Sequence, residues 1–158
     1  MKILLIEDDP NKKTQLCNFL NNLKEVNIIQ TNSYKSGLRA VVKDSFDLVI
    51  LDMSMPTFDI TINESGGRIL PFAGKEILRQ MKRRNIIIPT IVVTQFEKFG
   101  EYEKMIYLEE LNEELALEFS ENYIDTVNYN PTSSSWIDSL KENIKKIGFD
   151  DFDENFNN

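Results

Sequence analysis

Carboxylates that could carry chemistry stand at the ends of two short apolar runs. The run near the amino terminus is followed at once by Glu7, Asp8 and Asp9, and the run 48–51 is followed by Asp52. If both runs are neighbouring parallel strands, their carboxyl ends meet at one edge of the sheet and the acids converge there. Convergent carboxylates repel one another, and a donor set of oxygens alone favours a hard cation such as Mg2+. The pattern therefore predicts a Mg2+ site beside an acidic nucleophile.

These acids differ in how strongly each indicates a site. Asp9 precedes a proline, so a helix N-cap is its better interpretation. Glu7 and Asp8 taken alone would be solvated loop acids, whereas an unpaired carboxylate directly after a buried run, as at Asp52, would be costly. Thr94 ends a later apolar run and places a hydroxyl on the neighbouring strand, where it could hydrogen-bond a phosphoryl oxygen; its alternative role is that of an ordinary β-branched strand residue.

The elements that must position these side chains alternate between strand and helix. Apolar runs predict strands at 3–6, 26–29, 48–51 and 86–93, with a weaker one at 123–129. Amphipathic patterns predict helices at 12–23, 34–43, 75–84, 108–119 and 135–147. Continuous apolar strands are typical of parallel strands that are covered on both faces. The predicted fold class is α/β, a doubly wound five-stranded parallel sheet of flavodoxin-like order 2-1-3-4-5 with helices on both faces.

Length and composition predict one domain. A chain of 158 residues with 41% hydrophobic residues fills one core but not two. We expect the domain to span residues 1–148, with two inserted loops at about 57–73 and 95–107 that are longer than the fold needs. Residues 149–158 form an acidic, Asn-rich tail that we expect to be disordered.

Charge and missing residue types exclude several functions. The net charge of -8 disfavours direct contact with nucleic acid or an anionic membrane surface. The absence of histidine excludes Ser-His-Asp catalysis and histidine-ligated zinc. A single cysteine, Cys17, cannot form an internal disulfide and fits a reducing cytoplasm. No apolar run is long enough to span a membrane, and the amino terminus does not read as a signal peptide. A cytoplasmic location is therefore expected.

The motifs together resemble the response-regulator receiver family over about residues 2–147. The stretches that carry the resemblance are ILLIEDDP, DLVILDMSMP, TIVVT and an Asn-Pro after the fifth predicted strand. The resemblance implies a stand-alone signalling domain, not an enzyme, that accepts a phosphoryl group on Asp52. A histidine kinase or phosphotransfer protein would be the donor, and a downstream effector protein would receive the signal. It also implies that Glu7, Asp8, Asp52 and the backbone carbonyl of Ser54 hold Mg2+, and that Thr94 is the switch hydroxyl.

The sequence departs from the family at the turn after the fifth strand. The family has a lysine before the proline there, contacting the phosphoryl group, and the matching residue is Asn130. Asparagine cannot neutralise charge, so a cation is expected to be missing from the phosphorylated state. The aromatic switch position would be Val127, with Tyr129 close by as a substitute.

This departure leaves an alternative function open. The chain could be a pseudo-receiver that binds a partner constitutively through residues 96–107 and the helix that follows, without phosphorylation. The missing lysine favours that reading, whereas the presence of all the acids and of Thr94 favours a working acceptor. A Mg2+-dependent phosphatase is a weaker third possibility, because such enzymes usually need an acid where Ser54 stands.

Overall fold

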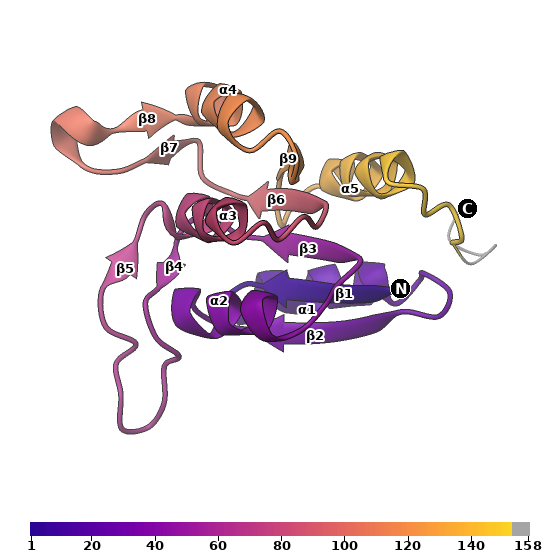
Figure 1. The fold of residues 1–158 in the computed structure, drawn as a ribbon, viewed down its shortest axis with the longest axis horizontal. Helices are drawn as coiled ribbons and strands as arrows, with labels where there is room; N and C mark the ends of the chain where they lie inside the picture. Colours follow the sequence, from indigo (N-terminus) through magenta and orange to yellow (C-terminus); the bar gives the residue numbers. More distant parts are fainter. Residues whose placement is uncertain (153–158) are drawn as a thin grey trace.

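The structure is a computed structural model in which residues 1–152 are described, and its centre is a five-stranded parallel sheet (Figure 1). The strand order is β2-β1-β3-β6-β9, so the predicted order and fold class are confirmed. The strands are β1 Lys2–Ile6, β2 Asn27–Thr31, β3 Leu48–Leu51, β6 Thr90–Thr94 and β9 Tyr123–Asn128.

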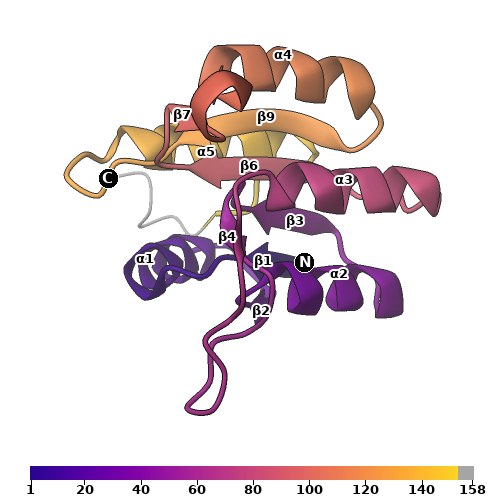
Figure 2. The same ribbon diagram turned by 90° about the vertical axis from the view of Figure 1, so that its left-hand side faces the viewer.

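Within residues 1–152, five α-helices lie on the two faces of the sheet (Figure 2). They are α1 Pro10–Leu20, α2 Tyr34–Lys43, α3 Ala73–Arg83, α4 Leu108–Glu118 and α5 Ser135–Lys146. Alternate side chains of each central strand point to opposite faces, which divides the core into two clusters. One cluster lies under α2, α3 and α4, and the other under α1 and α5. All four residues of β3 are fully buried, as expected of a strand covered on both sides.

The largest boundary difference lies before β6. The predicted strand 86–93 begins only at Thr90, because Asn122 takes the place of a neighbouring strand for the residues before it. The side-chain oxygen of Asn122 accepts a hydrogen bond from Ile88 N at 2.8 Å, and its amide nitrogen donates to Ile86 O at 3.1 Å. The apolar run 86–93 therefore begins before the strand does, and its first residues are held by Asn122 rather than by a neighbouring strand.

Each of the two predicted loops is part of a short β-hairpin, and residues 57–68 between the strands of the first contain neither helix nor strand. The first is built from β4 Met55–Pro56 and β5 Ile69–Leu70, and the second from β7 Lys98–Phe99 and β8 Ile106–Tyr107, with the short 3-10 helix η1 Tyr102–Lys104 at its tip. Because β4 follows β3 and β7 follows β6, both hairpins extend beyond the carboxyl edge of the sheet (Figure 1). Both therefore stand next to the edge where ligands bind in this kind of sheet.

The beginning of the predicted tail is packed against the domain. The Phe152 side chain is 6% exposed, and its ring centroid lies 6.2 Å from that of Phe19 on α1. The backbone nitrogen of Lys24 donates to Asp151 O at 3.0 Å. This differs from the expectation of a disordered tail, and the rest of that segment, 153–158, lies outside the described residues. Within residues 1–152, no helix combines the length and apolar character needed to cross a membrane.

Candidate functional site

The register of two neighbouring strands brings the acids together. In the β1–β3 pair Ile6 lies opposite Leu51, so the next residues, Glu7 and Asp52, leave the sheet side by side. The backbone nitrogen of Asp52 continues the ladder by donating to Ile6 O at 3.0 Å. Glu7, Asp8 and Asp52 each offer a carboxylate oxygen, and these three atoms lie within 4.8 Å of one another. The convergence expected from the strand ends is therefore present.

Burial makes this cluster unfavourable as a set of free anions. Glu7 is 1% exposed and Asp52 is 6% exposed, while Asp8 is half-buried. Desolvation, reinforced by the neighbouring Asp52 carboxylate, raises the pKa of Glu7 to about 7 against the opposing effect of Lys12. Desolvation also raises the pKa of Asp52 and of Asp8 above their ordinary values. The crevice therefore gains from a positive charge.

A buried lysine that the sequence motifs did not indicate supplies that charge. Lys12 is 2% exposed, and its ammonium nitrogen lies 2.6 Å from Glu7 Oε2 and 3.3 Å from Asp52 Oδ2. The same nitrogen donates a hydrogen bond to Val93 O at 2.7 Å, on the neighbouring strand β6. The turn after β9 carries Asn130 and no lysine, as the sequence shows, but an ammonium from α1 lies beside the acids.

The start of α1 explains why Lys12 faces the sheet. Asp9 is the N-cap, as predicted, and its Oδ1 accepts hydrogen bonds from the backbone nitrogens of Asn11 and Lys12 at 2.9 and 3.0 Å. Counting from Lys12, the buried side chains of Leu16 and Phe19 follow at spacings of four and seven, so all three share one helix face. That spacing was the signal available in the sequence: a lysine at an otherwise apolar position.

The two carboxylate oxygens of Glu7 have different surroundings. Oε1 accepts a hydrogen bond from Asp9 N at 2.9 Å, which ties the carboxylate to the turn that opens α1. Oε2 is buried and lies 2.6 Å from the Lys12 ammonium, and it accepts no hydrogen bond from the residues that the structure describes. A buried oxygen without a hydrogen bond can still be satisfied by a metal ion. Together with the all-oxygen donor set, this makes the residues present a fit for Mg2+.

The acids line a small cavity of about 200 Å³ at the carboxyl edge of the sheet. Its wall includes Ser54, the predicted carbonyl ligand, and residues of the two hairpin segments, including Ile69 on β5 and Phe96 before β7. The lining residues are Glu7, Asp8, Asp9, Lys12, Asp52, Ser54, Met55, Ile69, Gln95 and Phe96. The insertions therefore help to shape the entrance of the acid site.

One glycine allows α3 to begin directly against the end of β3. A Cβ atom on Gly74 would lie 2.6 Å from Asp52 O, closer than real contacts allow, and 3.1 Å from Met53 Cα. Gly74 N donates to Met53 O at 2.9 Å, and Met53 N donates to Asp52 Oδ1 at 2.7 Å. The backbone after β3 thereby fixes the direction of the Asp52 carboxylate, leaving Oδ2 toward Lys12.

Two other predicted site residues do not line the cavity. Thr94 ends β6 fully buried, and its hydroxyl accepts a hydrogen bond from Phe96 N at 3.3 Å. Asn130 is exposed, and its side-chain oxygen accepts from the backbone nitrogen and the hydroxyl of Thr132 at 2.9 and 2.8 Å. No cis peptide bond occurs among residues 1–152, so the Asn130-Pro131 bond is trans. The structure therefore uses Asn130 to close its own turn.

The aromatic residue near the switch position lies under the ammonium. Tyr129 is 3% exposed, and its ring centroid is 5.2 Å from that of Trp136 on α5. The Lys12 nitrogen lies 5.8 Å from the centre of the same ring, within the range of a cation-π contact. Val127 is fully buried on the same face. Tyr129 is thus packed in the core beside the site, rather than on an exposed surface.

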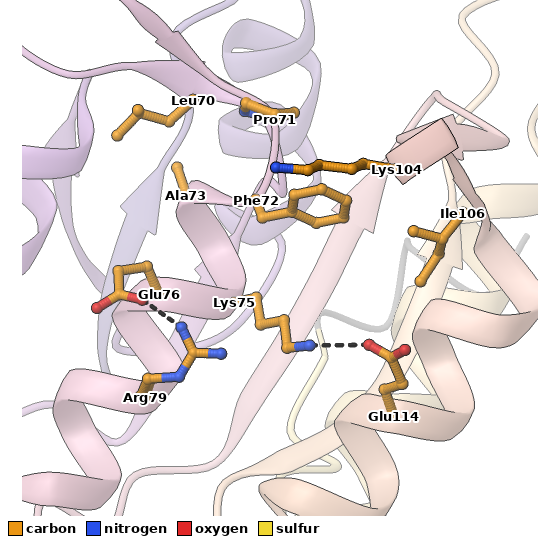
Figure 3. A pocket seen from close by; sticks show the side chains of 10 residues that line it. All are labelled: Leu70, Pro71, Phe72, Ala73, Lys75, Glu76, Arg79, Lys104, Ile106 and Glu114. Carbon is orange, nitrogen blue, oxygen red and sulfur yellow. Dashed lines mark hydrogen bonds and ion pairs between the residues drawn. The ribbon is translucent and has the colours of Figure 1, made fainter. Parts of the chain in front are cut away.

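A larger cavity of about 440 Å³ lies away from these acids, between α3 and the second hairpin (Figure 3). Its charged side chains are largely paired with one another: the Lys75 ammonium lies 2.8 Å from Glu114 Oε2, and Arg79 pairs with Glu76. Apolar side chains such as Phe72 and Ile106 form the rest of its wall. It holds no carboxylate cluster, so size alone does not locate the chemistry of this protein.

Comparison with known families agrees with this geometry. Residues 3–109 match the response regulator receiver domain. The chain belongs to this family. The resemblance stated from the motifs is therefore confirmed, and the protein is a receiver domain of two-component signalling.

Two relatives match this receiver domain over most of its length. One is an uncharacterized protein, y4jR, from Sinorhizobium fredii, with 31% identity over 89% of this chain and 95% of that protein. The other is the Detocs response regulatory protein DtcB from Enterobacter cloacae, with 32% identity over 93% of this chain and 98% of that protein.

Solved structures share the receiver fold at low sequence identity. The response regulator TrrA from Thermotoga maritima, solved in complex with Mg2+ and beryllium fluoride, has a TM-score of 0.61 and 20% identity over 92% of this chain and 97% of that one. A DNA-binding response regulator of the LuxR family from Staphylococcus aureus has a TM-score of 0.63 and 18% identity over 92% and 97%. At such identities these likenesses support the fold alone.

Proposed function

We propose that this receiver domain accepts a phosphoryl group on Asp52 from a histidine kinase or phosphotransfer protein and passes the signal on by protein contact. The observation that carries the proposal is the position of Asp52: a buried carboxylate at the carboxyl edge of β3, next to two further acids and a buried ammonium. A merely structural carboxylate gains nothing from two acidic neighbours. An acceptor of a phosphoryl group, by contrast, needs bound cations close to it.

In the proposed transfer, an oxygen of Asp52 attacks the phosphorus of a phosphohistidine in line. The new O–P bond forms as the P–N bond breaks, and the electron pair of the P–N bond stays on the ring nitrogen. When the other ring nitrogen of the donor is protonated, the leaving group is neutral imidazole. Glu7, Asp8, Asp52 and the Ser54 carbonyl would hold Mg2+, which when bound offsets the negative charge that develops on the phosphoryl oxygens. Thr94, at the end of β6, is proposed as the hydroxyl that responds to the new group.

The partners follow from the same proposal. The donor is a phosphohistidine protein, and the receiver of the signal is a downstream effector protein rather than nucleic acid, in keeping with the net charge of -8. A cytoplasmic location belongs to this proposal as well and rests on the single cysteine. We also propose that residues 1–148 act as one receiver unit, with both hairpins as insertions into it.

The test is incubation of the protein with Mg2+ and acetyl phosphate, followed by intact mass measurement and peptide mapping. We expect one added phosphoryl group that maps to Asp52. The Asp52→Asn variant, which keeps the shape of the side chain but not the nucleophile, is expected to remain unmodified. An unmodified wild-type protein that still binds Mg2+ would contradict the proposal.

One observation favours a second candidate function, that of a pseudo-receiver acting as a binding module. The two hairpins expose large apolar side chains, among them Ile60, Ile62 and Tyr102, which are 66%, 104% and 92% exposed. Exposed apolar material of this kind is typical of contact surfaces. The pseudo-receiver would bind its partner equally well with and without acetyl phosphate, whereas a working receiver would change its affinity on phosphorylation.

A further inference from the structure

We propose that Lys12 is the cation that contacts the phosphoryl group in this receiver, in place of the lysine that the family carries after the fifth strand. The proposal rests on the proposed function, since it assigns a partner to a phosphoryl group on Asp52. It assigns to α1 a role that the sequence motifs place in the turn after β9.

The position of the ammonium supports this role directly. The Lys12 nitrogen lies 3.3 Å from Asp52 Oδ2, the oxygen that the Met53 backbone nitrogen does not engage. In a phosphorylated Asp52 the phosphorus would be bonded to the carboxylate oxygen, and the phosphoryl oxygens would lie two bonds beyond that oxygen, inside the cavity that Lys12 lines. The ammonium is therefore already next to the place where the new charge appears.

Charge balance requires such a group. A phosphoryl group carries roughly one and a half to two negative charges, in a crevice that already contains Glu7 and Asp8. Lys12 is the one basic side chain among the residues that line this cavity. At the turn after β9, Asn130 is neutral and exposed, and its side-chain oxygen is already hydrogen-bonded to Thr132. Any compensation from the protein itself therefore has to come from Lys12.

The ammonium is also held in place from outside the acid cluster. Its hydrogen bond to Val93 O fixes it to β6, one residue before Thr94. The ring of Tyr129 lies on another side, with its centre 5.8 Å from the nitrogen. These two contacts do not involve Glu7 or Asp52, so they hold the ammonium in the crevice independently of any change at the Asp52 carboxylate. Preorganised charge of this kind stabilises developing anions efficiently.

A purely structural role is the competing explanation, because a buried ammonium between Glu7 and Asp52 also lowers their mutual repulsion. The two roles differ in what can replace Lys12. If the phosphoryl group needs an ammonium, Asn130→Lys, in the turn after β9, should restore function to a Lys12→Met protein. If Lys12 only supports the fold locally, a lysine on an exposed turn cannot replace it.

The experiment compares wild type, Lys12→Met, Asn130→Lys and the double variant, with Lys13→Met as the matched control. Lys13 is the next residue on α1, carries the same charge and pairs with Asn32 instead of with the acids. The measurements are the rate of phosphoryl incorporation from acetyl phosphate with Mg2+, the affinity for beryllium fluoride, and circular dichroism and Tm to verify folding. Loss of a charge-assisted hydrogen bond corresponds to a decrease of about tenfold to a hundredfold.

We expect Lys12→Met to lower incorporation and beryllium fluoride affinity by that factor, Lys13→Met to remain within about twofold of wild type, and the double variant to recover most of the loss. Asn130→Lys alone should change little, because Lys12 already supplies the charge. Equal incorporation by Lys12→Met and wild type would overturn the role of Lys12 and leave the proposed function intact. An inert wild type with an active Asn130→Lys variant would overturn both the role of Lys12 and the proposed function of the wild-type protein. If wild type and Asn130→Lys are both inert although Mg2+ binds, the proposed function itself fails, and the inference with it.

A second measurement uses wild-type protein alone and does not depend on the folding of Lys12→Met. The protein is labelled with 15N at the lysine side chains. Beryllium fluoride with Mg2+ should change the chemical shift of the buried Lys12 ammonium, and this change should differ from the one that Mg2+ causes alone. The Lys13 signal should stay in place. An unchanged Lys12 signal in protein saturated with beryllium fluoride would exclude contact between the ammonium and the phosphoryl group.

Discussion

The crevice between β1 and β3 and the turn after β9 stand in contrast, although the family motifs lead one to expect charge in both. In the crevice, Glu7, Asp52 and Lys12 are buried together with two carboxylate-ammonium contacts. At the turn, Asn130 is exposed, and its side-chain oxygen accepts hydrogen bonds from Thr132 in the same segment. The comparison teaches that the charge balance of a site is set by what lies around it in space. A family motif can lack its usual cation when another element of the fold places one in the same cavity.

The largest effect should come from the acceptor itself. Asp52→Asn removes the nucleophilic carboxylate, so incorporation from acetyl phosphate should fall to background. Asp138→Asn, the same substitution at an exposed position on α5, should leave incorporation at the wild-type level. Intact mass with peptide mapping checks both. If Asp52→Asn is still phosphorylated, the acceptor lies outside the crevice, and the comparison loses its basis.

The next effect concerns the metal. Asp8→Ala deletes one of the three converging carboxylates, and we expect Mg2+ affinity to fall by about tenfold or more, since affinity in all-oxygen sites follows the number of anionic ligands. Titration calorimetry or amide chemical shifts measure this. The control Asp138→Ala removes an equal charge from the surface of α5 and should have little effect. An Asp8→Ala protein that binds Mg2+ as tightly as wild type would show that the ion uses a different site.

The third effect is a pH dependence of stability in the metal-free protein. Burial raises the pKa of Glu7 to about 7 in the folded state, above its ordinary value of 4.5, so the folded chain holds this proton more tightly than the unfolded chain does. The resulting contribution to stability is complete below pH 4.5 and is lost as the pH rises through 7. We expect the Glu7-dependent part of the free energy of unfolding to decrease by roughly 1–3 kcal/mol over that interval.

The measurement for this effect is urea unfolding between pH 5.5 and 8 in the presence of EDTA. In Glu7→Gln, whose side chain cannot ionise, the free energy of unfolding should decline less with rising pH than it does in wild type. Mg2+ should oppose the decline, because it favours the ionised carboxylate. A wild-type profile parallel to that of Glu7→Gln would mean that Lys12 keeps Glu7 ionised throughout the range.

Much of this architecture could be read from the sequence, because it depends on local pattern. The five strand runs, the Asp9 cap and the convergence of Glu7, Asp8 and Asp52 follow from periodicity and from the rule that parallel strands end at one edge. The role of Lys12 could not be inferred from motif matching, because it depends on which way the first turn of α1 faces. Its spacing from the apolar residues of the helix was the available signal.

The hairpins and the packing of Phe152 could not be predicted from local sequence pattern, for a different reason. Two-residue strands such as β4 and β7 are too short to show alternation, and they pair only because the chain returns on itself. The buried position of Phe152 depends on a distant partner, Phe19, that no neighbouring residue indicates. Long-range packing of this kind is settled by the whole fold.

The smallest effect, and the sharpest check of the comparison, is expected at Asn130. Asn130→Ala removes the two hydrogen bonds that its side chain accepts in an exposed turn, which should cost about 0.5–1 kcal/mol of folding stability. It changes no charge in the crevice, where Lys12 remains 3.3 Å from Asp52 Oδ2, so phosphoryl incorporation should stay within about twofold of wild type. Asp52→Asn serves as the null reference in the same assay. If Asn130→Ala instead lowers incorporation tenfold while its Tm stays near that of wild type, the turn after β9 takes part in the chemistry. The division between a charged crevice and a neutral turn would then be wrong.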